Sequence, residues 1–419
     1  MARSNVIAAL DIGTSKICCF IAVLEEDGRI RVTGIGHQAS RGVKAGAIVD
    51  MDAAEQSVMA AVNTAERMAD ETVREIVVGL AGGHPESRLV DMRTTINGGP
   101  VRDADLRRLL YGSGTLETSL ERAVLHAVPV GYSIDGSNGI RDPRGMHGHN
   151  LAVHVHEVTA AASAVRNVTT CVERCHLNVA DVAANPYAAG IATLVPDESE
   201  LGVTVIDMGG GTTSMTVFID GSPVFSDSIP VGGRHVTSDI ARGLATSLSH
   251  AERLKTLHGS ALPSPSDERE SVVAPQVGEE DSDEPNLVPK SFLVSIIAPR
   301  IEETLELVRD RLNAGGAARE AGRRVVLTGG ACQLPGVREL AARMLDRQIR
   351  IGRPTQVAGL AAATNGPAFS ACAGLLRLTA EQPHELRLPS AGGTLSATEG
   401  LLARLGPLGR IGGWLRENL

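Results

Sequence analysis

The sequence predicts an α/β protein built from two similar domains that face each other. The first observation is a repeat: strand, Asp-x-Gly turn and strand occur at VIAALDIGTSKICCFIAVL and again, 196 residues later, at VTVIDMGGGTTSMTVFI. Asp11 and Gly13 of the first copy match Asp207 and Gly209 of the second. The second observation is that strand and helix patterns alternate after each copy. A supersecondary unit repeated at this distance indicates a duplicated domain, and the alternation indicates mixed sheets covered by helices.

The expected elements follow in order from these patterns. In the first half, strands are expected at VIAAL and ICCFIAVL, a helix at 53–69, a strand at 75–80 and another helix at 158–175. In the second half, VVLTGG at 325–330 predicts a buried strand that ends in Gly-Gly, and a helix is expected from about 336 to 345. These assignments rest on helical spacing of apolar residues and on short apolar runs bounded by turns.

Composition narrows the class of protein. The 419 residues allow two or three domains, and 43% are hydrophobic, but only one Trp, three Tyr and five Phe are present, so the cores must consist mostly of Ala, Val, Leu and Ile. A net charge of −9 with so few aromatic residues argues against nucleic-acid binding. The six cysteines form no CxxC pair, which favours reduced thiols in a cytoplasmic protein. The longest uncharged run, 354–376, contains polar residues, proline and glycine, so any membrane contact is expected to be peripheral.

Two segments interrupt the alternating pattern. Residues 84–163 contain short strands and charged stretches, and they are interpreted as a small inserted domain. Residues 259–290 carry eight acidic residues against two basic ones, which is −6 of the chain's −9, together with five prolines. A proline-rich segment of this charge predicts a disordered acidic loop, because it has little apolar surface to bury.

The end of the sequence predicts a linker followed by an amphipathic helix. Residues 381–407 are expected to be a flexible linker, and 408–419 (LGRIGGWLRENL) to be the helix. The apolar residues recur at spacings of three and four, which places them on one helical face. Two arginines can meet anionic lipid headgroups. The expected membrane-contacting residues are Leu408, Arg410, Ile411, Trp414, Leu415, Arg416 and Leu419.

The paired turns carry the chemistry that the sequence suggests. Walker A, GxSxG and HExxH patterns are absent, so three common enzyme signatures are missing. Glycine-rich turns expose backbone N–H groups that suit phosphate oxygens, and hydroxyl and amine side chains add further donors. Asp11 and Asp207, at the strand ends, can hold a hydrated Mg²⁺ ion between them. The predicted phosphate-binding residues are Gly13, Thr14, Ser15, Lys16, Gly209, Gly210, Gly211, Thr212 and Thr213.

Simpler interpretations remain for some of these residues. Lys16 would also suit a solvated turn, and the two aspartates would also suit turns in which they bond their own backbone. Four histidines between 147 and 156 invite a metal site, but no fitting acidic or cysteine cluster accompanies them. Cys171, Cys175 and His176 are interpreted as packing residues around one helical turn.

The motifs resemble those of the actin, sugar-kinase and heat-shock-ATPase superfamily. DIGTSK looks like its first phosphate motif and DMGGGTTS like its second. VVLTGGACQLPGV resembles its adenosine motif, which implies adenosine contacts for Gly329, Gly330 and Ala331. SHAERLKTLHG resembles the helix whose Glu and Lys flank the nucleoside, and Glu252 and Lys255 occupy those places.

Within that superfamily the chain is most similar to the FtsA family of bacterial cell-division proteins. The supporting stretches are VLHAVPVGYSIDG, GIRDPRGMHG, VERCHLNV, ELGVTVIDMGGGTTS, HVTSDIARGL, QIRIGRP and the terminal WLREN. The similarity extends over nearly the whole chain and weakens at 259–290 and 381–399. It implies an actin-like (ribonuclease H-like) duplicated two-domain ATPase fold. The implied subdomains are 1A at 1–83 and 164–196, the inserted 1C at 84–163, 2A at 197–231 and 322–380, and 2B at 232–321.

The resemblance also implies a function. It suggests ATP with Mg²⁺ between the domains, actin-like filaments formed with other copies of the chain, and binding to anionic lipids on the cytoplasmic face of the cell membrane at the division septum. It further implies docking of FtsZ through subdomain 2B, for which Arg300 and Glu303 on the expected helix 299–312 are candidates, although these charges would also suit a solvated helix face. Other division proteins would bind through subdomain 1C.

One alternative function shares the same fold. A small-molecule kinase would need a catalytic Asp base near the terminal phosphate, and the sequence offers no such motif beyond Asp207. The sequence leaves open whether ATP is hydrolysed, because it identifies no water-positioning residue.

Overall fold

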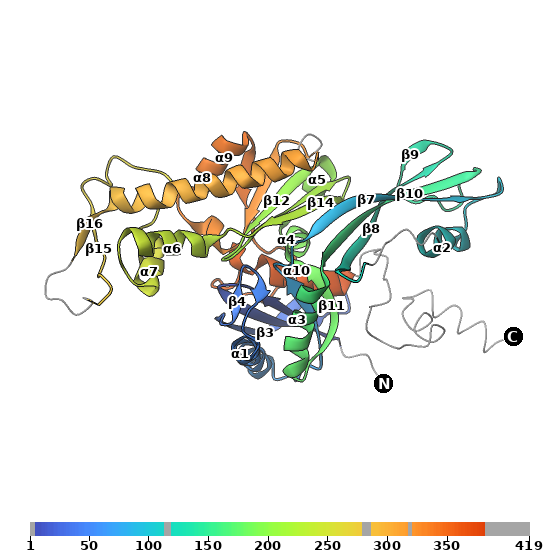
Figure 1. The fold of residues 1–419 in the computed structure, drawn as a ribbon. Helices are drawn as coiled ribbons and strands as arrows, with labels where there is room; N and C mark the ends of the chain where they lie inside the picture. Colours follow the sequence, from blue (N-terminus) through green and yellow to red (C-terminus); the bar gives the residue numbers. More distant parts are fainter. Residues whose placement is uncertain (1–4, 113–118, 279–285, 317–320, 382–419) are drawn as a thin grey trace. The chain divides into compact units, whose positions relative to one another are not determined.

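The duplication predicted from the sequence is present as two sheets with the same strand order. The computed structural model describes residues 5–112, 119–278, 286–316 and 321–381 (Figure 1). The first sheet has the order β11-β6-β1-β2-β3-β19 and the second has the order β14-β13-β12-β17-β18. The strands of the first sheet are β1 (Val6–Ile12), β2 (Lys16–Leu24), β3 (Ile30–Ala39), β6 (Glu75–Leu80), β11 (Asn178–Ala184) and β19 (Val357–Ala358). Those of the second are β12 (Val203–Met208), β13 (Thr213–Ile219), β14 (Ser222–Ile229), β17 (Arg324–Thr328) and β18 (Gln348–Ile351).

The register repeats as well as the order. Asp11 pairs with Cys18 across the β1–β2 hairpin, and Asp207 pairs with Ser214 across β12–β13, so each Asp faces the residue seven positions later. Each Asp also ends a strand that runs parallel to a neighbour, β6 in the first sheet and β17 in the second. The two copies therefore present the same turn at the same edge of each sheet.

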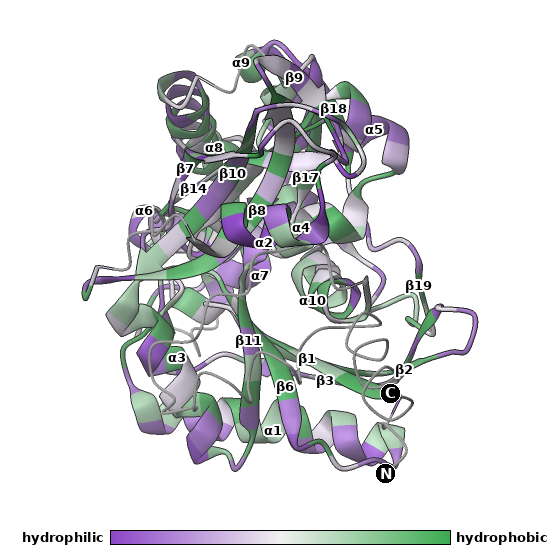
Figure 2. Cartoon of the chain, turned by 90° about the vertical axis from the view of Figure 1, so that its right-hand side faces the viewer, coloured by the Kyte–Doolittle hydropathy of each residue, from purple (hydrophilic) through white to green (hydrophobic). Residues whose placement is uncertain are grey.

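Both faces of the first sheet are covered by helices. Ile17 and Cys19 alternate with Cys18 and Phe20 along β2, and the two sets belong to different hydrophobic clusters. One cluster includes α1 (Met51–Ala69) and α3 (Ala162–Arg174), and the other includes α4 (Asn185–Thr193) and α10 (Ser370–Glu381). Figure 2 shows α1 along one side of this sheet and α10 on the other. Covering both faces explains why the strand sequences are continuously apolar instead of alternating.

Glycine and alanine set the distance between these helices and the sheet. A Cβ atom on Gly34 of β3 would lie 2.2 Å from the Ala65 carbonyl oxygen of α1, and one on Gly36 would lie 1.8 Å from that of Ala61. On the other face, a Cβ on Gly374 of α10 would lie 1.8 Å from the Ala188 oxygen of α4. Backbones this close leave little room for aromatic rings, which agrees with a composition rich in small apolar residues.

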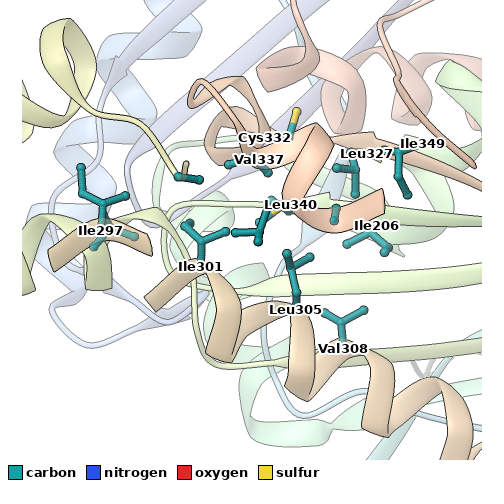
Figure 3. Close-up of a cluster of buried hydrophobic side chains, with 14 of the residues drawn as sticks. Ile206, Ile297, Ile301, Leu305, Val308, Leu327, Cys332, Val337, Leu340 and Ile349 are labelled. Carbon is teal, nitrogen blue, oxygen red and sulfur yellow. The ribbon is translucent and has the colours of Figure 1, made fainter. Parts of the chain in front are cut away.

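The second domain packs a long helix against its sheet. α8 (Lys290–Ala314) directs Ile297, Ile301, Leu305 and Val308 at helical spacing toward residues of β12, β17 and α9 (Val337–Leu345), as Figure 3 shows. Pro299 lies inside this helix, which therefore begins well before the helix 299–312 expected from the sequence. The remaining elements of this domain are α5 (Pro196–Leu201), α6 (Gly233–Gly243), α7 (Leu248–His258) and the short helices η1 (Gly330–Gln333) and η2 (Pro367–Phe369).

Residues 84–163 form a separate sheet in the order β7-β10-β8-β9. Its strands are β7 (Glu86–Thr95), β8 (Arg122–Ile134), β9 (Ser137–Ile140) and β10 (Asn150–Ala161). Helix α2 (Asp103–Gly112) packs on one face, at the right of Figure 1. The helix expected at 158–175 begins only at Ala162, because Val158 and Thr159, both β-branched, continue β10.

The expectation of a disordered acidic loop over 259–290 is wrong for the residues that the structure describes. Residues 259–278 and 286–290 include a small hairpin of β15 (Ser271–Val273) and β16 (Leu287–Pro289), in which Val272 is buried. The Lys290 amine lies 3.2 Å from Asp267 and 2.9 Å from Glu270, so it offsets two of the acidic charges. Residues 279–285, which hold five of the eight acids, lie outside the described residues.

The linker and amphipathic helix expected at the end of the chain, apart from Glu381 in α10, also lie outside the described residues. Within the described ranges no helix is both long and apolar enough to span a bilayer. The two remaining short strands, β4 (Val43–Lys44) and β5 (Ala47–Ile48), pair with each other ahead of α1.

The hairpin offers a direct test of its burial. Val272 is 4% exposed and Val273 is 51% exposed, although they are neighbours on one strand. We expect Val272→Asp to lower the free energy of unfolding by about 2–4 kcal/mol, because it places a carboxylate in an apolar core. Val273→Asp, the matched control, should change it by less than about 0.5 kcal/mol. Urea denaturation compares the two, and equal stability of both variants would show that this hairpin is not packed on the domain.

A buried histidine gives the fold an acid-sensitive group. His156 on β10 is 1% exposed, and neither ring nitrogen has a hydrogen-bond partner in the described structure. Burial, together with the nearby His126, lowers the pKa of His156 to about 3. The unfolded chain takes up a proton at this residue below about pH 6.5, whereas the folded chain does not until about pH 3. This residue therefore removes stability as the pH falls from about 6.5 toward 3.

Replacing this histidine should make the protein less sensitive to acid. Between pH 6.5 and 5, we expect His156→Leu to lose about 1.5 kcal/mol less stability than the unaltered chain, since one pKa unit corresponds to about 1.4 kcal/mol. His154→Leu, two residues away on the same strand but part-exposed and bonded to Asp91, serves as the control. Urea denaturation at several pH values measures the difference. An unchanged pH dependence in His156→Leu would contradict the assigned pKa shift.

Candidate nucleotide-binding site

The two Asp-x-Gly turns have the same backbone geometry. In the first, Gly13 N donates to the Lys16 carbonyl at 3.0 Å, and in the second Gly209 N donates to that of Thr212 at 2.9 Å. A Cβ on Gly13 would lie only 2.8 Å from the Lys16 oxygen, so this tight turn requires glycine. The structure therefore places both predicted motifs as equivalent turns at the strand ends.

The two turns also touch each other. A Cβ on Gly210 would lie 2.0 Å from Ser15 Oγ, and one on Gly211 would lie 2.3 Å from Thr14 Oγ1. Thr14 Oγ1 accepts a hydrogen bond from Gly46 N at 2.9 Å, which fixes the hydroxyl. Positions 210 and 211 therefore require glycine because the side chains of the first turn leave no room for a Cβ atom. The sequence argument foresaw the need for glycine but ascribed it to an approaching phosphate.

The two aspartates of the predicted metal pair are electrostatically coupled; Asp11 is buried and Asp207 is half-buried. Asn185 donates to Asp11 Oδ1 at 2.8 Å, while its own Oδ1 has no partner among the described residues. Burial, together with the charge of Asp11, raises the pKa of Asp207 to about 7. Burial also raises the pKa of Asp11, against the opposing effects of Lys16 and Asn185. Two carboxylates that disfavour each other's ionisation, beside an unsatisfied amide oxygen, form a donor set that fits a hydrated Mg²⁺ ion.

Lys16 is not a solvated turn residue. Its amine donates to the Ala368 carbonyl of η2 and lies 3.3 Å from the centroid of the Phe369 ring. Burial lowers its pKa, and neighbouring Asp11 and Asp207 oppose that shift. Lys16 therefore connects the first turn to the segment that precedes α10. To bind a phosphate it must exchange a neutral carbonyl for the anion.

The predicted adenosine residues come together beside the second turn. The Lys255 amine of α7 lies 2.7 Å from Glu252, 2.9 Å from Thr237 and 3.1 Å from the Gly233 oxygen. Gly233 N in turn donates to the Gly209 oxygen at 3.0 Å. Ala331 of the adenosine motif VVLTGGACQLPGV also lies near Gly233, because a Cβ on Gly233 would lie 3.2 Å from Ala331 Cβ.

Gly329 of the adenosine motif VVLTGGACQLPGV lies directly against the Asp207 carboxylate. Gly329 has a φ of +85°, and a Cβ there would lie 2.3 Å from Asp207 Oδ1. Gly330 begins η1, which follows this residue. Thr213 is placed differently from the expectation of a phosphate donor, since its buried hydroxyl donates to the Val231 carbonyl at 2.9 Å. Thr212 is also largely buried, within the second turn.

Sequence reasoning missed the residues that support these turns from elsewhere. Asn185 begins α4 and reaches Asp11 over a separation of 174 residues, and Arg234 reaches the Thr14 carbonyl over 220. The Gly232-Gly233 pair before Arg234 was the one available signal, because consecutive glycines mark close backbone approaches. Nothing local marks Ala368 as the acceptor for Lys16.

Other candidate residues lie away from this cluster. Arg300 is bonded to Asp239 at 2.5 Å and to Glu303, and its pKa is raised chiefly by Asp239, so it links α8 to α6. Glu303 is half-exposed. Among the described residues no group of three His, Cys, Asp or Glu side chains is placed to hold a metal ion, the histidines of β10 included.

The contact between the turns yields a test of the site. Gly210→Val would force the second turn away from Ser15, and we expect nucleotide affinity to fall by about tenfold or more, which corresponds to about 1.4 kcal/mol. Gly99→Val is the control, because a Cβ at Gly99 meets nothing within 4 Å. Titration with a fluorescent ATP analogue measures both, with thermal unfolding to check folding. Unchanged affinity in a folded Gly210→Val protein would remove this turn from the site.

Comparisons with known proteins agree with this arrangement. The family model for Cell division protein FtsA matches residues 204–374, and the model for the SHS2 domain inserted in FTSA matches residues 82–159. The chain is 46% identical over 426 residues to Cell division protein FtsA of Rhizobium meliloti (strain 1021), covering 99% of this chain and 95% of that one. It is 31% identical over 421 residues to Cell division protein FtsA of Escherichia coli (strain K12), covering 99% and 98%.

Solved structures show the same fold at low identity. The PilM-PilN type IV pilus biogenesis complex gives a TM-score of 0.63 at 16% identity, covering 88% of this chain and 98% of that one. MreB5 of Spiroplasma citri bound to ADP gives 0.54 at 13% identity, covering 91% and 98%. These likenesses concern the fold alone, and they support the duplicated actin-like architecture. Since its relatives are identical at 31–46% of positions over almost its whole length, the chain belongs to the FtsA family of cell-division proteins.

Proposed function

We propose that this cell-division protein binds ATP with Mg²⁺ between its two domains and tethers FtsZ filaments to the cytoplasmic face of the cell membrane at the septum. The observation that carries the nucleotide part is the pair of equivalent turns, each preceded by an aspartate near the end of its strand and held in contact with the other. An actin-like fold with such turns is suited to a phosphate chain between two domains.

Different residues would bind the phosphates, the Mg²⁺ ion and the adenosine. Gly13, Ser15 and Lys16 would hold the phosphates from the first domain, and Gly209 and Gly210 from the second. Asp11 and Asp207 would hold Mg²⁺ through water, and the ion would offset phosphate charge when bound. The adenosine would lie toward Glu252, Lys255 and Gly329–Ala331, which the structure gathers beside the second turn. The proposal concerns a nucleotide-dependent switch and includes no rate of hydrolysis.

The tether rests on family membership and on the last residues of the sequence. Leu408, Ile411, Leu415 and Leu419 share one face of the expected helix, with Trp414 at its border. Such a short, glycine-containing helix binds a bilayer weakly, so an array of copies in a filament would make attachment firm. FtsZ would dock on subdomain 2B, where Glu303 of α8 is half-exposed, and other division proteins on subdomain 1C. Relatives that share 31–46% identity and the name FtsA favour this role over a small-molecule kinase.

Vesicle flotation tests the tether. FtsZ filaments mixed with anionic vesicles and ATP should float only when this protein is present. Trp414→Glu should leave FtsZ in the pellet, because a charge replaces the aromatic ring at the membrane interface. Gly413→Glu adds the same charge on the opposite side of the expected helix and should retain most flotation.

The same assay separates the two halves of the proposal. Trp414→Glu protein should still co-sediment with FtsZ filaments in the absence of vesicles. Flotation of Trp414→Glu at the level of the unaltered chain would show that the tail is not the anchor. Failure of the unaltered chain to co-sediment with FtsZ would contradict the tethering role.

A further inference from the structure

Arg234 has a fixed place between the two turns. It is the second residue of α6, and its backbone N donates to the Gly210 carbonyl at 2.8 Å. The residue before the helix permits this approach, because a Cβ on Gly232 would lie 2.6 Å from the Gly209 oxygen. The main chain of Arg234 is therefore held against the second glycine turn.

Its side chain extends to the other domain. Arg234 Nη1 donates to the Thr14 carbonyl of the first turn at 3.1 Å. One residue thus touches both turns, through its backbone on one side and its guanidinium on the other.

The guanidinium is poorly matched to its present partner. Its one side-chain hydrogen bond with a described residue goes to a neutral carbonyl, although a guanidinium carries five N–H donors. Arg234 is exposed, whereas the part-buried Arg300 and Arg350 bond the carboxylates of Asp239 and Glu198. Most of its donors are therefore free for a further acceptor, and a planar guanidinium matches phosphate oxygens in a bidentate fashion.

We propose that Arg234 is a phosphate-binding residue of the nucleotide site, supplied by the second domain and directed at the outer phosphates of the bound nucleotide. The inference rests on the proposed ATP binding and adds a residue that distinguishes nucleotides by the length of their phosphate chain. Lys16 supplies the corresponding cation from the first domain, where it now bonds the Ala368 carbonyl. A phosphate chain bound beside the two turns would give Arg234 and Lys16 an anionic acceptor in place of the neutral carbonyls that they bond now.

A purely structural role predicts a different result. If Arg234 only clamps the two turns together, its loss would weaken every adenine nucleotide to a similar degree, whatever the number of phosphates. If it binds phosphate, its loss would weaken ATP and ADP more than AMP. The ratio of affinities therefore separates the two roles.

The experiment titrates the full chain with fluorescent analogues of ATP, ADP and AMP in the presence of Mg²⁺. Arg234→Gln should weaken ATP by about 10- to 100-fold, the usual value of a hydrogen bond to a charged group, and AMP by less than about threefold. Arg234→Lys should recover part of the loss, because it restores the charge without the fork. Arg242→Gln, exposed near the end of the same helix, should match the unaltered chain.

The outcomes are distinguishable. Equal weakening of all three nucleotides, or no weakening of ATP in a variant whose thermal unfolding is unchanged, would overturn the role of Arg234 while leaving ATP binding intact. If Arg234→Gln unfolds, the ATP-to-AMP ratio of Arg234→Lys decides in the same way. Absence of ATP binding by the unaltered chain would overturn the proposed function itself, and this inference with it.

Discussion

The rest of this structure depends on a contact between the glycine backbone of the second turn and the hydroxyl side chains of the first. Gly210 and Gly211 approach Ser15 and Thr14 so closely that a single added carbon would collide. This contact requires each turn to end its strand at the same register, which the two sheets provide by repeating both strand order and pairing. It also brings Asp11 and Asp207 near enough to raise each other's cost of ionisation. The electrostatics of the site therefore follow from a steric condition on a few glycines.

Close packing that only small residues permit is also found throughout the first domain. Gly34, Gly36 and Gly374 place helix backbones almost directly on strand or helix backbones. Packing of this kind gains stability from many short contacts instead of a few large rings. It holds α4 rigidly against α10, and α4 is the helix that carries Asn185 to Asp11. The small-residue core and the placement of the carboxylate are thus parts of one arrangement.

How much the sequence could predict depended on how local each signal was. The two turns were found because Asp, Gly and their flanking strands are neighbours in the chain, and the repeat itself marked the duplication. The described parts of 259–290 were misjudged because order there comes from tertiary contacts: Val272 is buried by the domain, and Lys290 pairs with Asp267 and Glu270 from the start of a helix. Asn185 and Arg234 escaped notice for the same reason, since each acts on a turn more than 170 residues away. The composition of 259–290 gives its net charge correctly, but it does not show which residue pairs with each charge.

The long helix of the second domain has a mechanical consequence. Its 25 residues run from the β15–β16 hairpin across the second sheet, and Figure 1 shows the hairpin at its far end. From Leu305, which packs on the sheet, to its first residue the helix extends about 22 Å, so a tilt of about 10° at the sheet would displace that end by roughly 4 Å. Ile301, Leu305 and Val308 attach the rod to the sheet that ends in the second turn. The position of the β15–β16 hairpin is therefore tied, through α8, to the orientation of the sheet that leads into the second turn.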